Sequence, residues 1–263
     1  MVETAASAFR ASRLAAIIRV WRREGWPGVV SRLRTRVKRP PGAPPGPPPW
    51  PRPVLIGIEG PRESFARGIR LPAATNPTVS VVLPVHNHVD YTLSCLEAMA
   101  RHRPEASFEV VVVDDLSTDE TPRLLGLVEN LVYLRNEANL GFLRTVNRGA
   151  HAARGRYLLI LNSDTQPQPG WLDALLAAFD DPAVGLAGSK LIYPSGHLQE
   201  AGAVLRADGA VELVGLDDDP GLPEYNVARE VDHCSAASVM VPRDLFLELG
   251  GFDELYAPAY FED

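Results

Sequence analysis

Four short, mostly apolar runs constrain the fold more than any other feature of the sequence. They have the length and composition of strands that are buried on both faces of a parallel sheet. The runs occupy residues 79–85, 108–113, 131–134 and 157–161. Between and after them, apolar residues recur at helical spacing over residues 90–103, 118–130, 139–154 and 170–179. Because parallel strands need crossover connections, this alternation predicts an α/β domain with a doubly wound, mostly parallel sheet.

The pattern changes after residue 183. Shorter strand-like pieces cover residues 184–193 and 203–215, and the second contains Asp208-Gly209, a pair typical of a hairpin turn. A further strand and a helix are predicted over residues 235–241 and 242–249. This half of the chain therefore adds short strands to the predicted sheet domain.

The N-terminal part differs in composition from the rest. Residues 1–52 carry eleven Lys or Arg against two Glu, a formal charge of +9, whereas the whole chain carries −7, which leaves −16 for the remainder. Residues 8–24 show the spacing of a basic amphipathic helix, and nine of the fourteen residues at 40–53 are proline. We predict a basic helical arm at residues 1–39, a Pro-rich linker and lead-in at 40–76, and a catalytic-type domain at 77–263.

The composition of the basic arm is compatible with three interpretations. Residues 8–39 fit peripheral contact with an anionic membrane face, docking on another protein, or an organelle transit peptide. No run approaches the roughly 20 apolar residues that span a bilayer, and two cysteines give no disulfide framework. The acidic domain has no electrostatic reason to bind nucleic acid. We expect a cytoplasmic protein, peripheral at the inner face of the membrane if the arm binds lipid.

Polar and acidic residues follow three of the predicted strands or face their ends. Asp114 with Asp115, Asp164 with Asn162, and Glu262 with Asp263 are these positions. Open α/β sheets bind ligands at the carboxyl ends of their strands, and carboxylate oxygens suit Mg²⁺ or Mn²⁺. The competing interpretation is that Asn162 and Asp164 only turn the chain toward the next helix. A dinucleotide GxGxxG or a P-loop motif is missing, so we expect a metal rather than a glycine-rich turn to hold phosphates.

Four segments of the sequence resemble the inverting glycosyltransferases of family 2, which have the GT-A fold. SVVLPVHNHVDYT resembles the first strand and nucleotide-binding loop, and VVVDDLSTDET resembles the VVDDxSxDxT segment. LNSDTQPQPGWLDALL is similar to a variant of the DxD metal motif, with Asn162 where many members have Asp. GGFDELYAPAYFED is similar to the acceptor-side segment that ends in an ED pair. All four occur in the family's order, from about residue 79 to residue 263.

The resemblance implies a role for each group of residues. Nucleotide binding is implied for Pro84, Asn87, Asp114 and Asp115, and an aspartate is a suitable acceptor for the N3–H of uracil or thymine. Asp164, with Asn162, would hold Mg²⁺ or Mn²⁺ against the diphosphate. Asp263 would be the general base toward the acceptor hydroxyl, with Glu262 as the second candidate.

The resemblance also implies a function. We expect a metal-dependent hexosyl or deoxyhexosyl transferase that uses a UDP- or dTDP-sugar and a glycan or lipid-linked acceptor in cell-wall or polysaccharide biosynthesis. Members continue beyond the ED pair, so we expect the domain to be truncated at its C-terminus and weakly active or inactive in transfer. The alternative is a catalytically silent nucleotide- or glycan-binding module that its basic arm recruits. A nucleotidyltransferase is disfavoured, because a glycine- and arginine-rich loop does not follow the first strand.

Overall fold

The computed structural model describes residues 52–257. Among these residues, 52–204 and 213–257 belong to one compact unit, and residues 205–212 belong to another. The predicted basic arm and the first part of the Pro-rich linker lie outside the described residues, so their structure stays a prediction.

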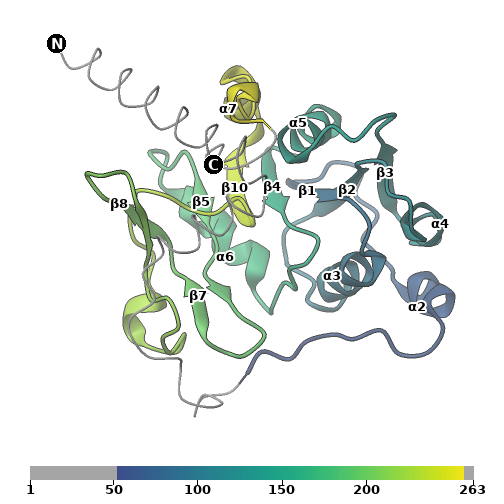
Figure 1. The fold of residues 1–263 in the computed structure, drawn as a ribbon, viewed down its shortest axis with the longest axis horizontal. Coiled ribbons are helices and arrows are strands. Elements are labelled where there is room, and N and C mark those ends of the chain that lie inside the picture. Colours follow the sequence, from purple (N-terminus) through teal and green to yellow (C-terminus); the bar gives the residue numbers. More distant parts are fainter. Residues whose placement is uncertain (1–51, 258–263) are drawn as a thin grey trace, which may run out of the picture. The chain divides into compact units, whose positions relative to one another are not determined.

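A six-stranded mixed sheet forms the centre of the larger unit (Figure 1). Four strands are parallel to one another, while β10 runs antiparallel to its neighbours β4 and β5. The order across the sheet is β3 (Leu131–Arg135), β2 (Phe108–Asp114), β1 (Val79–Val85), β4 (Tyr157–Leu161), β10 (Ser238–Pro242) and β5 (Ala187–Gly188). The predicted α/β class with a mostly parallel sheet is confirmed.

Helices cover both faces of this sheet. On one face, α3 (Val89–Arg101) and α6 (Trp171–Ala177) pack over a core that includes Leu83 and Leu159. On the other, α5 (Phe142–Ala152) and α7 (Arg243–Glu248) pack over a second core (Figure 1). Alternate residues of one strand serve the two cores, which explains why the central runs are apolar at nearly every position.

The contact between α5 and β1 is unusually close. A Cβ atom at Gly149 of α5 would lie 2.4 Å from Cγ1 of Val82 in β1, a distance that real Cβ atoms do not show. Glycine at this position therefore lets the helix backbone approach the sheet. The consequence is that α5 has little freedom to shift relative to the central strands.

The helices differ from the sequence predictions mainly in length. Residues 118–130 were expected to form one helix, but only α4 (Thr121–Leu125) is helical there, because Pro122 occupies its start and turns follow from Gly126. The lead-in segment was expected to lack regular structure, yet it contains α2 (Arg62–Gly68). This helix buries only Ala66, so it has no apolar periodicity to detect.

The later part of the described chain consists of short elements. The predicted hairpin turn at Asp208-Gly209 is present, with Gly209 in the left-handed region at φ 72°. Within residues 52–257, no helix is long and apolar enough to cross a membrane. The remaining elements are β6 (Leu191–Ile192), β7 (Leu198–Glu200), β8 (Ala203–Leu205), β9 (Val211–Leu213) and the 3₁₀ turns η1 (Ala178–Asp180), η2 (Pro223–Tyr225) and η3 (Glu254–Tyr256).

An ion pair between the buried Glu109 and the half-exposed Arg154 stabilises the edge of the sheet where the parallel strands begin. Glu109, near the start of β2, is 4% exposed, and its Oε1 accepts hydrogen bonds from the Ser80 hydroxyl at 2.6 Å and the Arg154 N–H at 2.8 Å. Its Oε2 accepts from Arg154 Nε at 2.8 Å. Burial alone would raise the pKa of Glu109, but the bonds from Arg154 and Ser80 outweigh it and the pKa lies below its ordinary value.

We expect Glu109→Gln to lower the free energy of unfolding at pH 7 by about 2 kcal/mol, because one buried acceptor becomes a donor that faces Arg154. A carboxylate with a lowered pKa in the folded state stabilises above the unfolded pKa, and this stability is lost as pH falls through the folded value. The difference between wild type and variant should therefore be complete above pH 4.5, the ordinary glutamate value, and shrink below it. Urea unfolding at pH 7 and pH 3 measures this. An equal difference at both pH values would contradict the assignment.

Candidate functional site

The strand order places the candidate site at one edge of the sheet. The chain proceeds from β1 outward to β2 and β3 and then returns to β4 on the other side of β1. The order reverses between β1 and β4, and open α/β sheets bind ligands in the crevice outside the carboxyl ends of strands at such a reversal. The loops after β1, β2 and β4 all lie at this edge, because Val85 pairs with Asp114 and Val82 with Ile160 in parallel register.

The loop after β1 is strained. Pro84 is half-buried within the strand, and the two residues that precede α3, Asn87 and His88, both have left-handed backbones, with φ of 59° and 55°. Two successive left-handed residues other than glycine are uncommon, and such strain persists only where the surroundings impose it. The loop is therefore held in one conformation by its neighbours.

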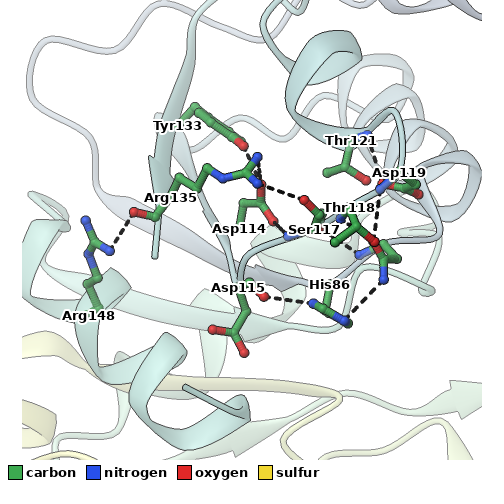
Figure 2. A network of polar contacts seen from close by, with 11 residues as sticks. His86, Asp114, Asp115, Ser117, Thr118, Asp119, Thr121, Tyr133, Arg135 and Arg148 are labelled. Carbon is green, nitrogen blue, oxygen red and sulfur yellow. Dashed lines mark hydrogen bonds and ion pairs between the residues drawn. The ribbon is translucent and has the colours of Figure 1, made fainter. Parts of the chain in front are cut away.

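The loop after β2 supplies these restraints (Figure 2). Asn87 Oδ1 accepts hydrogen bonds from the backbone N–H of Thr118 at 2.7 Å and of Asp119 at 3.2 Å. His86 Nδ1 lies 2.8 Å from the carbonyl oxygen of Asp115, to which it donates. The loops after β1 and β2 thus form one cross-linked wall of the site.

The Asp114 carboxylate is buried and bonded to neighbouring groups of the protein. It is fully buried, and its Oδ1 accepts the Ser117 N–H at 2.7 Å. Its Oδ2 accepts the Tyr133 hydroxyl and pairs with Arg135 Nη1 at 3.2 Å (Figure 2). Burial, and then the contact with the Asp114 carboxylate, raise the pKa of Tyr133 to about 12, so the phenol stays a donor. Asp114 therefore fixes the end of β2 against β3.

Asp115 retains one free acceptor position. Its Oδ1 accepts Asn136 Nδ2 and the Leu140 N–H, each at 2.7 Å, and its Oδ2 accepts the Gly141 N–H at 2.9 Å. A carboxylate oxygen can accept two hydrogen bonds. Oδ2 accepts only one from the described residues, so one acceptor position remains for a ligand. Asp115 is 5% exposed, whereas Asp114 is 0% exposed. Of the two predicted nucleotide-binding aspartates, Asp115 is the less completely buried and the one with a spare acceptor position on Oδ2.

The loop after β4 carries the two predicted metal ligands. Asn162 is half-buried. Its backbone carbonyl accepts hydrogen bonds from the Thr165 hydroxyl at 2.7 Å and from the Thr165 N–H at 3.2 Å. Asp164 is exposed, and its carboxylate has neither a hydrogen bond nor an ion pair with any of residues 52–257. It is an oxygen donor at the strand-order reversal that the fold itself does not use.

The rest of this loop is firmly held. The Gln166 side chain accepts the Ile56 N–H at 2.6 Å and donates to the Ile56 carbonyl at 3.0 Å. Nδ1 of His102, just after α3, lies 2.7 Å from the carbonyl oxygen of Pro167. The backbone carbonyl of His102 accepts a hydrogen bond from the Trp171 Nε1–H at 2.9 Å. The backbone around Asp164 is therefore fixed before any ligand binds.

The oxygen donors suit a hard divalent cation whose shell the ligand completes. In the described part of the chain, no group of three or more His, Cys, Asp or Glu side chains could hold a metal ion by itself. Mg²⁺ is commonly bound by one or two protein carboxylates, with phosphates and water filling the other positions. The Asp164 carboxylate, which has no hydrogen bond or ion pair with the described residues, and the nearby amide of Asn162 in the same loop fit such a cation and do not fit a permanently bound structural metal.

The acceptor-side segment is described only in part. Residues 250–257 are described and include η3, whereas the predicted base Asp263 and its alternative Glu262 lie outside the described residues. Glu200 in β7 is buried and accepts the Ser235 N–H at 3.3 Å. The roles predicted for Glu262 and Asp263 therefore stay predictions.

Three residues that hold the acidic pair in place were not predicted from the sequence. They are Tyr133 and Arg135 in β3 and Asn136 directly after it. Asn136 follows a strand end directly, which is the same signal that identified Asp114, but the run before it is short and half-buried. Their contacts with Asp114 and Asp115 can be recognised only once the order of the strands is known.

The sequence is similar to known proteins at the level of its family, of individual relatives and of solved structures. The sequence model described as Glycosyl transferase family 2 matches residues 80–241. The O-antigen biosynthesis protein RfbC of Myxococcus xanthus is 30% identical over 205 residues, which cover 72% of this chain and 16% of that protein. The glycosyltransferase AglE of Haloferax volcanii is 30% identical over 186 residues, which cover 68% of this chain and 57% of that protein. The chain thus spans less than two thirds of either relative.

Among solved structures, the mannosyltransferase PcManGT of Pyrobaculum calidifontis, in complex with GDP-Man and Mn²⁺, superposes with a TM-score of 0.47. It is 19% identical, and the match covers 96% of this chain and 59% of that one. The family match includes the loops after β1, β2 and β4 and extends over well over half of the sequence. The chain belongs to glycosyl transferase family 2.

Proposed function

We propose that the protein is a metal-dependent inverting glycosyltransferase that moves a hexosyl or deoxyhexosyl group from a UDP- or dTDP-sugar to a hydroxyl of a glycan or lipid-linked acceptor. Membership of family 2 supports the reaction class. One observation carries the proposal to specific residues: Asp164 is an exposed carboxylate without a partner among residues 52–257, in an otherwise bonded loop at the strand-order reversal. A free carboxylate in a rigid setting is what a ligand-completed metal site requires.

The nucleoside would bind along the wall formed by the loops after β1 and β2. Pro84 and Asn87 shape this wall, and Asp114 holds its backbone in place. The remaining acceptor position on Asp115 Oδ2 would receive the N3–H of uracil or thymine. Cytosine has no N3–H, so this contact alone would discriminate against cytidine nucleotides.

Asp164, with Asn162, would hold the divalent cation through oxygen atoms. When bound, Mg²⁺ or Mn²⁺ supplies positive charge that stabilises the departing diphosphate. The contribution of the chain is to present the Asp164 carboxylate at a fixed position, because the bonds of Thr165, Gln166 and Pro167 restrain the loop on its C-terminal side. This restraint lowers the entropy lost when donor and cation bind.

The chemical step is a single displacement at the anomeric carbon. The Asp263 carboxylate would accept the proton of the acceptor hydroxyl while that oxygen forms a bond to C1. The bond from C1 to the diphosphate oxygen breaks, and its electron pair leaves with the nucleoside diphosphate. Attack from the opposite face inverts the anomeric centre. Glu262 is the second candidate for the base.

The names of relatives support a glycan acceptor. The Myxococcus protein is named for O-antigen biosynthesis, and a Bacillus subtilis relative is a putative glycosyltransferase EpsH. We infer a role in making a surface polysaccharide, with residues 8–39 as a peripheral contact to the inner face of the membrane. The acidic domain would face the nucleotide sugar and take no part in nucleic-acid binding.

Metal-dependent nucleotide binding is the first test. We expect UDP or dTDP to raise the melting temperature in the presence of Mn²⁺ and to have a much smaller effect with EDTA, since bound ligand stabilises the folded state. Asp164→Ala should abolish the Mn²⁺-dependent part while changing the free energy of unfolding by less than about 0.5 kcal/mol, because the side chain is exposed. Asp180→Ala, which removes an exposed carboxylate in the 3₁₀ turn after α6, is the matched control. Equal shifts with and without metal would favour the silent binding module.

The nucleobase contact can be tested without changing the protein. We expect N3-methyl-UDP to bind about 10- to 100-fold more weakly than UDP, because a hydrogen bond to an ionised carboxylate is lost and a methyl group faces it. UDP methylated at C5 should bind like UDP, since it keeps the N3–H. Isothermal titration in Mn²⁺ gives the three dissociation constants. Equal affinity for all three nucleotides would rule out the contact with Asp115.

Membrane contact through the arm is tested by sedimentation with liposomes. We expect the full chain to sediment with vesicles of anionic phospholipid at low salt and to be released as ionic strength rises, because screening weakens the attraction of Lys and Arg. A chain without residues 8–39 and vesicles of neutral phosphatidylcholine are the two controls. Absence of binding at low salt would remove the membrane role.

A further inference from the structure

The chain between the Pro-rich linker and α2 is bonded to the domain at one residue. The Ile56 N–H donates to Gln166 Oε1 at 2.6 Å, and Gln166 Nε2 donates to the Ile56 carbonyl at 3.0 Å. Residues 52–60 make no other hydrogen bond or ion pair with the described part of the chain. We call residues 54–58 the anchor segment. Its polar attachment to the domain is the side chain of Gln166 alone.

Apolar packing occurs at the same point of the anchor segment. Ile56 is 8% exposed, whereas Val54 and Leu55 before it are 81% and 46% exposed. Ile58 is half-buried and packs on the core that includes Leu83. Ile56 is thus buried within a mostly exposed stretch, and one side-chain amide holds both of its backbone groups. Such a residue fixes the segment against the loop that carries Gln166.

This loop is the one that carries Asp164. Gln166 follows Asp164 by two residues, and two residues of extended chain span at most about 7 Å. Asp164 itself lies within a turn, residues 162–165, which the Asn162 carbonyl closes by accepting the Thr165 N–H at 3.2 Å. A shift of Gln166 would therefore move this turn and the carboxylate on it.

The other contacts on the C-terminal side of the turn are weaker or more distant. The Thr165 hydroxyl bonds back within the turn, and it lies 3.9 Å from Cys95 Sγ, whose hydrogen bonds are weak. The His102 ring contacts the Pro167 carbonyl, which is one residue farther from the turn than Gln166. The pair of bonds at Gln166 is therefore the nearest strong link from this side of the turn to a distant part of the chain.

We propose that Gln166 is a positioning residue for the cation site and that the anchor segment restrains it. The proposal rests on the proposed function for the role of Asp164 as a metal ligand, whereas the link between Gln166 and Ile56 rests only on the contacts above. The segment next to the Pro-rich linker thereby becomes part of the metal site. Because coupling between two sites is reciprocal, loss of the anchor weakens cation binding, and a bound cation stabilises the anchor.

A purely structural role predicts a different result. If the two bonds only stabilised the fold, their loss would lower the melting temperature and leave the Mn²⁺ affinity of the folded protein unchanged. With a positioning role, the turn gains freedom that cation binding must remove, so the Mn²⁺ affinity falls. Binding of UDP without metal stays the same, because the Asp115 carboxylate is held by Asn136 and the start of α5 and not by this loop.

The first experiment measures Mn²⁺ binding by electron paramagnetic resonance at saturating UDP, with the full chain. We expect Gln166→Met, which keeps the length of the side chain and removes both bonds, to bind Mn²⁺ about fivefold to tenfold more weakly than the wild type. Its affinity for UDP in EDTA should stay within about twofold of the wild type. The melting temperature of the ligand-free variant is measured alongside.

A second variant acts from the other side of the same contact. Ile56→Pro removes the N–H that Gln166 accepts and should also weaken Mn²⁺ binding. It provides the test if Gln166→Met does not fold. Leu55→Pro is the matched control, because this neighbouring residue is exposed and makes no hydrogen bond with the described residues. Its Mn²⁺ affinity should equal that of the wild type.

The reciprocal effect is measured by amide hydrogen exchange at Ile56. We expect this amide to be protected in the ligand-free wild type and to exchange about fivefold to tenfold more slowly with UDP and Mn²⁺ bound, the same factor as the loss of Mn²⁺ affinity. The Phe65 amide, which bonds the Pro61 carbonyl, is the internal control and should not respond to the ligands. Rapid exchange at Ile56 in the wild type would overturn the proposal.

Each outcome decides a separate question. Unchanged Mn²⁺ affinity in Gln166→Met and Ile56→Pro would overturn the positioning role, whether or not the melting temperature falls. Equal losses in Ile56→Pro and Leu55→Pro would also overturn it, because the bond to Gln166 would then not be the cause. If the wild type does not bind UDP with Mn²⁺, the proposed function fails, and positioning of a cation fails with it. Failure of the positioning role alone leaves Mn²⁺-dependent UDP binding by the wild type intact.

Discussion

In a sheet that is buried on both faces, polar side chains that bind ligands can lie only at the edges. Every residue of β2 and β4 is buried, so polar side chains can collect only where the strands end. The reversal of strand order between β1 and β4 then selects one place on that edge, because the chain continues from β1 to β2 on one side and from β4 to β5 on the other. Asn87, Asp115 and Asp164 reach the same edge from different parts of the chain. The candidate site is thus a consequence of the topology, and the family resemblance assigns a reaction to it.

Adjacent acidic residues have different uses at this edge. Asp114 is fully buried and bonded to Tyr133, Arg135 and the Ser117 N–H, so its removal would expose a set of unpaired donors. Asp115 shares its carboxylate between the start of α5 and one open acceptor position. A buried carboxylate is tolerated only when hydrogen-bond donors or cations pair with its oxygens. A carboxylate that binds a ligand must keep at least one acceptor position free. Burial and bonding therefore separate a structural aspartate from a candidate ligand one residue away.

The sequence predicts those parts of the fold that local composition determines. The strands β1, β2 and β4 lie within a residue of their apolar runs, because a buried strand requires an apolar side chain at almost every position. The helix α2 and the shortness of α4 were missed, since α2 buries only Ala66 and turns replace the helix after Leu125. Asp164 was identified from its place after a strand, but only the structure shows that its carboxylate has no hydrogen bond or ion pair with residues 52–257. Tyr133 and Asn136 were missed because their partners are distant in sequence. The roles of Glu262 and Asp263 stay predictions.

One helix connects the loop after β2 with residues 250–256. Gly149 seats α5 against β1, so a displacement of the helix would disturb the centre of the sheet. Asp115 accepts an N–H group at the start of this helix, and Asn147 bonds the backbone of Phe252 in both directions. Because the same helix makes both contacts, the loop after β2 and residues 250–256 cannot shift independently of the central strands.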